Sequence, residues 1–326
     1  MVVRRIQKVG TSTYTVALPK EWIESKGLGA KSEVDLQIMD DGSIRISTIN
    51  SKKKEKEIVI KEKEKDAGFL IRKIMAAYIG GYDIIKLDLS EIEPEFEGME
   101  KIRKFIKSKM AGAEIIEESM NNITIQVILR PYEYPLSRIL IRMASLVHNM
   151  IIDICKALIS KNKNILLDVI ERDDDVDRLY FMGSRWLANM IENRYSLIDY
   201  DIKSSKEVLE YRIIFRHVER VADHVCKIAT VLLNSINNID DNIVEIIKEL
   251  LEKTGGIFVK SINCVKSINV LDANKVIHDA RDLVKKIEEF LVNEKIDDLI
   301  IILDSIKRIS EYGIGISEIV FNISVN

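Results

Sequence analysis

The spacing of hydrophobic residues divides the chain into a strand-rich first part and a helical second part. Up to about residue 48, hydrophobic and polar positions alternate in short runs, as in 33–38 and 43–47, which is typical of strands. The second expected strand, residues 13–18, ends at Pro19, and residues 20–26 after it fit one short helix. The order predicted for this part is strand, strand, short helix and hairpin.

The pattern changes after a charged run at residues 51–57, which has no hydrophobic anchor and predicts a solvated linker. Residues 58 to about 130 then alternate between strand-like and helix-like spacing, which predicts a small α/β module. Beyond Pro135, the last proline, the spacing is helical throughout, which favours a bundle of long helices. The expected helices span about 135–160, 164–196, 204–236, 241–269, 272–293 and 296–322.

The helical part contains an internal repeat. The stretch HVERVADHVCKIATVLLN, which starts at His217, aligns without a gap with SIKRISEYGIGISEIVFN, which starts at Ser305. Arg220 then matches Arg308, and the two stretches also agree in residue type at most apolar positions. We therefore expect two copies of a three-helix unit. The fold class predicted is multidomain α+β, with domains at 1–50, 57–130, 134–238 and 239–326.

Charge and cysteine content narrow the class of protein. The 326 residues carry a formal net charge of −3, so nucleic-acid binding would have to come from a local basic patch. The cysteines Cys155, Cys226 and Cys264 are far apart and lie in apolar helical stretches, which is typical of reduced thiols in the cytoplasm. No signal segment and no apolar run long enough to cross a bilayer is apparent, so we expect a cytoplasmic protein without membrane insertion.

Basic residues gather near the N-terminus. Arg4, Arg5 and Lys8 fall on the first expected strand, and Lys20 begins the short helix. Clustered lysine and arginine can neutralise DNA phosphates and give salt-dependent binding, although a basic surface without that role is the alternative. A domain this short buries little core alone, so dimerisation is expected in either case.

Two stripes of side chains run along the expected helix 204–236. An apolar seam is formed by Ile214, Val218, Val221, Val225, Ile228 and Leu232. A charged stripe nearly opposite the seam, and therefore facing out of the bundle, is formed by Arg212, Arg216, Glu219 and Asp223.

Pairs of acids on two helices suggest a cation site. Glu219 and Asp223 are four residues apart, and so are Asp173 and Asp177 on the preceding helix. Neighbouring carboxylates repel unless a cation joins them, and such hard oxygen ligands suit magnesium, manganese or iron. Spacing alone favours a solvated acidic face over a metal site.

Catalytic motifs are missing from the sequence. It contains no G-x-S-x-G, no phosphate-binding P-loop, no G-x-G-x-x-G after a strand and no H-E-x-x-H. This favours a protein that binds over an enzyme.

Two families resemble parts of the chain. Residues 5–10, RIQKVG, followed by 15–22, TVALPKEW, resemble the AbrB/SpoVT family. The resemblance implies an intertwined, swapped β dimer that binds DNA through basic strand and loop residues. Residues 171–179, 216–229 and 307–322 resemble the PhoU family of phosphate-uptake regulators. That resemblance implies tandem three-helix bundles with carboxylate-bound metal clusters on their outer surface, and the two together look like an archaeal form of the regulator.

The resemblances sharpen the expected site and function. They raise the metal hypothesis for Asp173, Asp177, Glu219 and Asp223, with at most a weak second site near Glu311 because Lys307 replaces the acid that would match Glu219. The expected function is phosphate-responsive regulation of phosphate uptake, with DNA, a second copy of the chain and a phosphate transporter ATPase or signalling protein as partners. The alternatives are a metal-dependent phosphohydrolase and an interaction protein that does not bind DNA.

Overall fold

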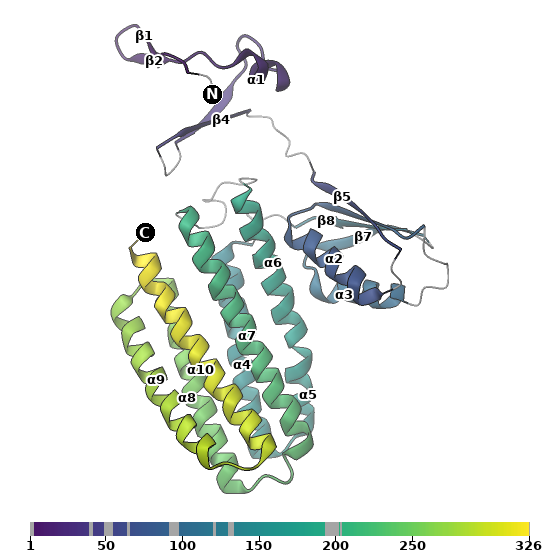
Figure 1. Cartoon of the computed structure of the whole chain (residues 1–326), viewed down its shortest axis with the longest axis vertical. Helices are drawn as coiled ribbons and strands as arrows, with labels where there is room; N and C mark the ends of the chain where they lie inside the picture. Colours follow the sequence, from purple (N-terminus) through teal and green to yellow (C-terminus); the bar gives the residue numbers. More distant parts are fainter. Residues whose placement is uncertain are drawn as a thin grey trace. The chain divides into compact units, whose positions relative to one another are not determined.

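The structure is a computed structural model that describes residues 3–38, 42–48, 55–63, 66–90, 98–119, 122–129, 134–192, 202 and 204–325. The chain divides into two compact units, Met1–Lys54 and Glu55–Asn326 (Figure 1). The second unit contains both the α/β module and the helical bundle.

The first unit has the element order expected from the sequence. It consists of β1 (Gln7–Val9), β2 (Thr13–Thr15), α1 (Lys20–Ser25), β3 (Val34–Ile38) and β4 (Ile44–Thr48). The antiparallel pairs β1–β2 and β3–β4 form two separate sheets. The first strand is shorter than expected, so Arg4 and Arg5 precede it instead of lying on it.

No described residue of this unit is buried. Apolar side chains on three of its strands are instead largely exposed, among them Val9 on β1, Leu36 and Ile38 on β3 and Ile44 on β4. A strand that leaves its apolar side chains in water lacks the burial that stabilises a sheet. The described residues of a single copy of this unit therefore form no hydrophobic core of their own.

The α/β module is a four-stranded sheet with two helices. Its elements are β5 (Glu57–Lys61), α2 (Ala67–Ile79), β6 (Ile84–Asp88), α3 (Gly98–Lys109), β7 (Ala113–Glu118) and β8 (Asn122–Val127). The strand order is β5-β6-β8-β7, in which β5 and β6 are parallel and the other pairs are antiparallel. Both helices cover the same face of the sheet (Figure 1), and the core between these layers includes Leu70, Ile74, Ile85, Ile102 and Ile125.

The remainder of the described chain is a bundle of long helices. These are α4 (Leu136–Ser160), α5 (Lys163–Glu171), α6 (Asp173–Ile191), α7 (Ser205–Ser235), α8 (Asp241–Ser267), α9 (Val270–Asn293) and α10 (Asp297–Ser324). They share one continuous apolar core, and every residue of the predicted seam on α7 is fully buried in it. This helical architecture confirms the predicted all-helical second half.

One predicted helix is wrong in its boundaries. The segment 164–196 forms two helices, α5 and α6, which meet at Arg172, and residues 193–196 lie outside the described residues. The acidic run Asp173–Asp175 explains the new start, because the positive end of the helix dipole stabilises carboxylates in a first turn. Arg172 braces the junction through its ion pairs with Asp153 and Asp168, both at 2.6 Å.

Helix α4 is long and apolar enough to cross a bilayer by length and composition, and it is the one helix of the described residues that passes this test. Half of its most apolar stretch is buried inside the bundle. Its buried side chains, such as Met143, Val147 and Ile154, belong to the common core, as expected of a core helix in a bundle.

Candidate functional site

Helices α6 and α7 pack side by side and bring the four predicted acids of the first repeat together (Figure 1). Asp173 and Asp177 come from α6, and Glu219 and Asp223 come from α7. Asp177 and Asp223 each interact electrostatically with two or more of the other carboxylates. We call these four residues the carboxylate cluster.

The cluster is less exposed than the sequence predicted. The expectation that these acids face solvent is wrong for Glu219, which is only 9% exposed, and Asp173 and Asp177 are half-buried. The sequence pattern could not show that α7 packs closely against α6, or that the α/β module packs against α6 beside Asp177.

Burial changes the protonation of the cluster. Burial, and next the negative charge of Asp177, raise the pKa of Asp173 to about 6. Burial, and next the charge of Asp223, raise the pKa of Glu219 to about 7, although Arg216 and Arg220 oppose the shift. The pKa of Asp177 is also raised, first by burial. Negative charge on these groups is therefore poorly compensated by the surrounding protein.

Two carboxylate oxygens of the cluster lack a hydrogen-bond partner among the described residues, namely Oδ1 of Asp173 and Oε2 of Glu219, which lies 3.9 Å from Nε of Arg220. The other oxygen of Glu219, Oε1, accepts a hydrogen bond of 2.9 Å from Arg216, and Oδ2 of Asp223 accepts one of 2.8 Å from Arg220. Buried oxygens without a partner are energetically costly, so the cluster has spare capacity to accept a donor or a cation.

A lysine from the α/β module enters the cluster. The Nζ atom of Lys109, the last residue of α3, lies 2.5 Å from Oδ1 of Asp174 and 2.7 Å from Oδ2 of Asp177. Burial alone would lower the pKa of this ammonium, but its hydrogen bonds to Asp174 and Asp177 outweigh burial and raise it. This contact could not be predicted from the sequence, because Lys109 lies on another module and on a helix whose last turn also carries Lys107.

The chemistry of the cluster fits a hard divalent cation, but the geometry is not that of a preformed metal site. Carboxylate oxygens are the ligands that magnesium and manganese prefer, and two of them lack partners here. Among the described residues, however, no three acidic, histidine or cysteine side chains converge as a ready set of ligands. Lys109 already occupies one side of the cluster as a positive charge.

The second repeat offers a much weaker site. Glu311 on α10 is paired with Arg308 at 3.0 Å and lies 3.9 Å from Lys307, which itself pairs with Glu288 on α9. Arg308 and Glu311 thus repeat the pairing of Arg220 with Asp223 in the first repeat. One carboxylate between two cations gives a poor cation site.

The histidines near the cluster in sequence face another element. The rings of His217 and His224 lie 5.3 Å and 5.9 Å from the ring of Tyr312 on α10, measured between centroids. They therefore contribute to the packing of α7 against α10.

The basic residues that the structure describes in the first unit are all exposed. Arg4, Arg5 and Lys8 lie before or on β1, and Lys20 begins α1. The ammonium of Lys20 is 3.5 Å from Glu24, in a pair whose side chains are both well exposed. Such a surface pair is weak and leaves the lysine able to meet a phosphate.

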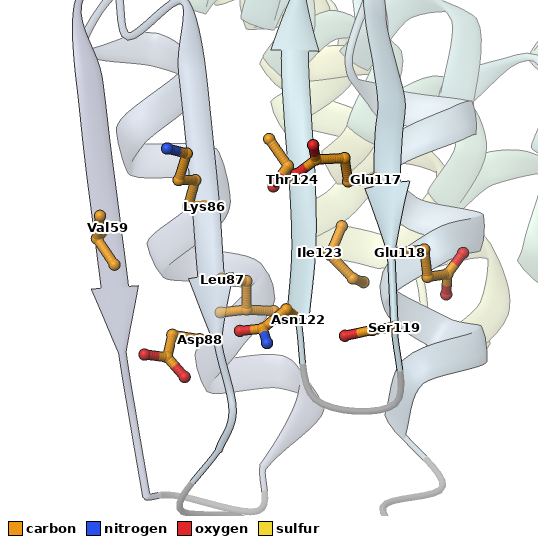
Figure 2. Close-up of a pocket in the computed structure, with 10 residues that line it drawn as sticks. All are labelled: Val59, Lys86, Leu87, Asp88, Glu117, Glu118, Ser119, Asn122, Ile123 and Thr124. Atoms are coloured by element: carbon orange, nitrogen blue, oxygen red, sulfur yellow. Dashed lines mark hydrogen bonds between the residues drawn. The ribbon is translucent and has the colours of Figure 1, made fainter.

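A shallow pocket lies on the open face of the sheet. Its cavity volume is about 460 Å³. Figure 2 shows Val59, Lys86, Thr124 and Glu117 in a row across the four strands, with the helices behind the sheet. The ten lining residues include no histidine or cysteine, Lys86 is paired with Glu57, and Thr124 donates to Glu117.

Comparisons with known proteins match two parts of the chain. Residues 140–232 match the PhoU domain, and residues 7–66 match the domain described as antidote-toxin recognition MazE, bacterial antitoxin. The chain therefore carries a PhoU-like region on the bundle and a MazE-like region at its N-terminus. A search of curated proteins gave no match.

Two solved structures are similar to the bundle. One is PhoU from Pseudomonas aeruginosa, which has 14% identity over 58% of this chain and 95% of that chain, and a TM-score of 0.49. The phosphate transport system regulatory protein PhoU from Streptococcus pneumoniae has 14% identity over 58% of this chain and 93% of that chain, and a TM-score of 0.47.

Proposed function

We propose that this protein is a cytoplasmic, phosphate-responsive regulator of phosphate uptake that binds DNA as a dimer. The observation that carries the proposal is the joining of a MazE-like region and a PhoU-like region in one chain. The first supplies a basic surface suited to DNA, and the second supplies a bundle suited to contacts with a phosphate transporter ATPase or a signalling protein. The protein acts by binding and not by turnover.

Dimerisation is supported by the exposed apolar strands of the first unit. Its described residues form no core, although Leu36, Ile38 and Ile44 are each more than 60% exposed. A second copy that covers these side chains would provide the missing burial. The dimer would also double the number of basic residues that face one DNA duplex.

DNA binding is tested by gel shift of the full chain over a series of salt concentrations. In the proposed dimer, Arg4→Ala/Arg5→Ala removes four positive charges. Each lost phosphate contact reduces the slope of log affinity against log salt by about 0.9. Lys26→Ala is the matched control, because Lys26 is exposed in the same unit but lies outside the proposed site. Equal affinity and slope in all three proteins would remove DNA binding from this surface.

We further propose that the carboxylate cluster binds magnesium, manganese or iron. Support comes from the oxygens of Asp173 and Glu219 that lack partners and from the raised pKa values of both residues. Such an ion, when bound, would neutralise the crowded carboxylates of Asp173, Asp177, Glu219 and Asp223. Glu311 would hold at most a weak second ion because Lys307 and Arg308 already neutralise it.

Elemental analysis of protein purified without a chelator tests the cation site. The metal content should fall in Glu219→Ala/Asp223→Ala and stay unchanged in the control Glu245→Ala/Glu249→Ala, which removes two exposed acids from α8. Equal content in all three proteins would mean that the acids form only a charged surface. A phosphatase assay on the metal-loaded protein tests the alternative: turnover abolished by Asp223→Ala would replace the regulatory proposal with a phosphohydrolase.

A further inference from the structure

The α/β module contacts helix α6 at two sites of different character. Near the middle of α6, the guanidinium of Arg185 donates to the carbonyl oxygens of Tyr78 and Tyr82, both at 2.7 Å, and pairs with Asp83 at 3.0 Å. Arg185 and Asp83 are almost completely buried. We call this contact the anchor. Separating Arg185 from Asp83 would leave buried charges without a partner of opposite sign, which is energetically costly.

The second contact is the one between Lys109 and the start of α6. It joins the same module to Asp174 and Asp177, about three and about two helical turns from Arg185. The side chains of Lys109 and Asp177 are 15% and 21% exposed, but that of Asp174 is 54% exposed, so water reaches this contact from the side of Asp174. An ion pair that water reaches opens at much lower cost than a buried one. We call the contact of Lys109 with Asp174 and Asp177 the latch. The anchor thus keeps the module on α6, while the latch can open.

Lys109 and a divalent cation would compete for the same charge. A magnesium ion binds carboxylate oxygens at about 2.0–2.1 Å. An ion bound to Asp177 would lie within a few ångströms of the Lys109 ammonium, which is 2.7 Å from the same carboxylate. Two cations this close repel each other strongly in a half-buried site. The ion and the ammonium therefore compete for the charge of Asp177.

We propose that Lys109 is the resident cation of the carboxylate cluster, and that a divalent ion binds there only by displacing it and releasing the end of α3 from α6. The inference rests on the cation-site part of the proposed function. The inference gives the α/β module a role. Binding of a divalent ion to the cluster lets the end of α3 move, while Arg185 keeps the module attached to α6. A regulator could use this movement to report the ionic state of its bundle to a partner.

Titration of the full chain with Mn²⁺, followed by calorimetry, tests the competition. Because Lys109 holds the site closed, the apparent affinity is reduced by the fraction of molecules that are open. Lys109→Gln should therefore bind Mn²⁺ more tightly, by about tenfold if the latch is closed in about 90% of molecules. Lys109→Arg keeps the positive charge and should bind no more tightly than the natural protein. Lys107→Gln is the control, because Lys107 is exposed two residues earlier on the same helix.

Hydrogen exchange measured on the same samples reports the movement. Mn²⁺ should speed exchange in the last turn of α3 in the natural protein, and exchange near Tyr78 should stay slow because the anchor holds. In Lys109→Gln the last turn should exchange fast without Mn²⁺.

The outcomes separate the latch from the cation site. Equal Mn²⁺ affinity in the natural protein and in Lys109→Gln would overturn the latch and leave the cation site standing. Binding by Lys109→Gln alone would support the latch. An absence of Mn²⁺ binding in every variant would overturn both the latch and the cation site, while the proposal of DNA binding would be unaffected.

Discussion

The ammonium of Lys109 lies 2.7 Å from Oδ2 of Asp177, which joins two residues that are 68 positions apart in the sequence. The contact makes the α/β module part of the carboxylate cluster. It also places a positive charge where four acids would otherwise repel one another. The module, which carries no recognisable motif of its own, thereby gains a place in the proposed site.

Loss of the anchor should destabilise the second unit severely. Arg185→Met leaves Asp83, which is 4% exposed, without its charged partner. Removing one partner of a buried pair typically costs about 3–5 kcal/mol of unfolding free energy. Urea denaturation measures this loss, and Arg185→Met/Asp83→Asn should recover part of it. A loss below about 1 kcal/mol in the single variant would contradict the anchor.

The space beside two helical glycines, Gly183 on α6 and Gly256 on α8, predicts opposite effects for their substitution. A Cβ atom at Gly183 would lie 2.5 Å from Cε1 of Phe215, a fully buried ring, so Gly183→Ala should cost about 1–3 kcal/mol. A Cβ atom at Gly256 on α8 meets nothing within 4 Å, so Gly256→Ala should stabilise the helix by about 0.5–1 kcal/mol. Thermal or urea unfolding of both variants checks the sign of each change.

The thiol of Cys155 should be unreactive at neutral pH. Burial, and next the charge of Glu252, raise its pKa to about 11. A thiol with that pKa has about 100-fold less thiolate at pH 8 than one with a pKa of 9, and the thiolate is the reactive form. Alkylation followed by peptide mass spectrometry should show slow labelling that rises with pH, and fast labelling in urea. Fast labelling of the native protein at pH 8 would show that Cys155 is not buried.

The exposed strands of the first unit should control the oligomeric state. Ile38 and Ile44 are paired neighbours on β3 and β4, and both are largely exposed. Ile38→Lys/Ile44→Lys should convert a dimer into monomers in analytical ultracentrifugation, because charged side chains cannot be buried between two copies. Leu209→Lys is the control, since Leu209 is 62% exposed on α7. A double variant that remains a dimer would place the dimer interface elsewhere.

The sequence predicted those features that depend on local spacing. The apolar seam of α7, from Ile214 to Leu232, is fully buried, and the two pairs of acids with a spacing of four residues lie on the neighbouring helices α6 and α7. Helical periodicity determines which side of a helix a residue faces, so these features could be read directly from the order of residues.

The features that the sequence did not predict depend on contacts between distant segments. Periodicity runs through Arg172, so it did not show that the helix stops there and starts again at Asp173. It also does not show what covers a charged stripe, so the burial of Glu219 and the approach of Lys109 were missed. The approach of Lys109 arises from the packing of α3 on α6, and the burial of Glu219 arises from the packing of α7 in the bundle, and no local pattern determines either.

The central claim, that this is a DNA-binding regulator of phosphate uptake, is tested most directly by sequencing the DNA that the protein binds in its own cells. Immunoprecipitation should be done with phosphate plentiful and with phosphate scarce, for the natural chain and for Arg4→Ala/Arg5→Ala. The account predicts enrichment of DNA beside phosphate-transport genes, a change in that enrichment with phosphate, and its loss in the variant. Recovery of no DNA above the background of an untagged strain in either condition would contradict the claim.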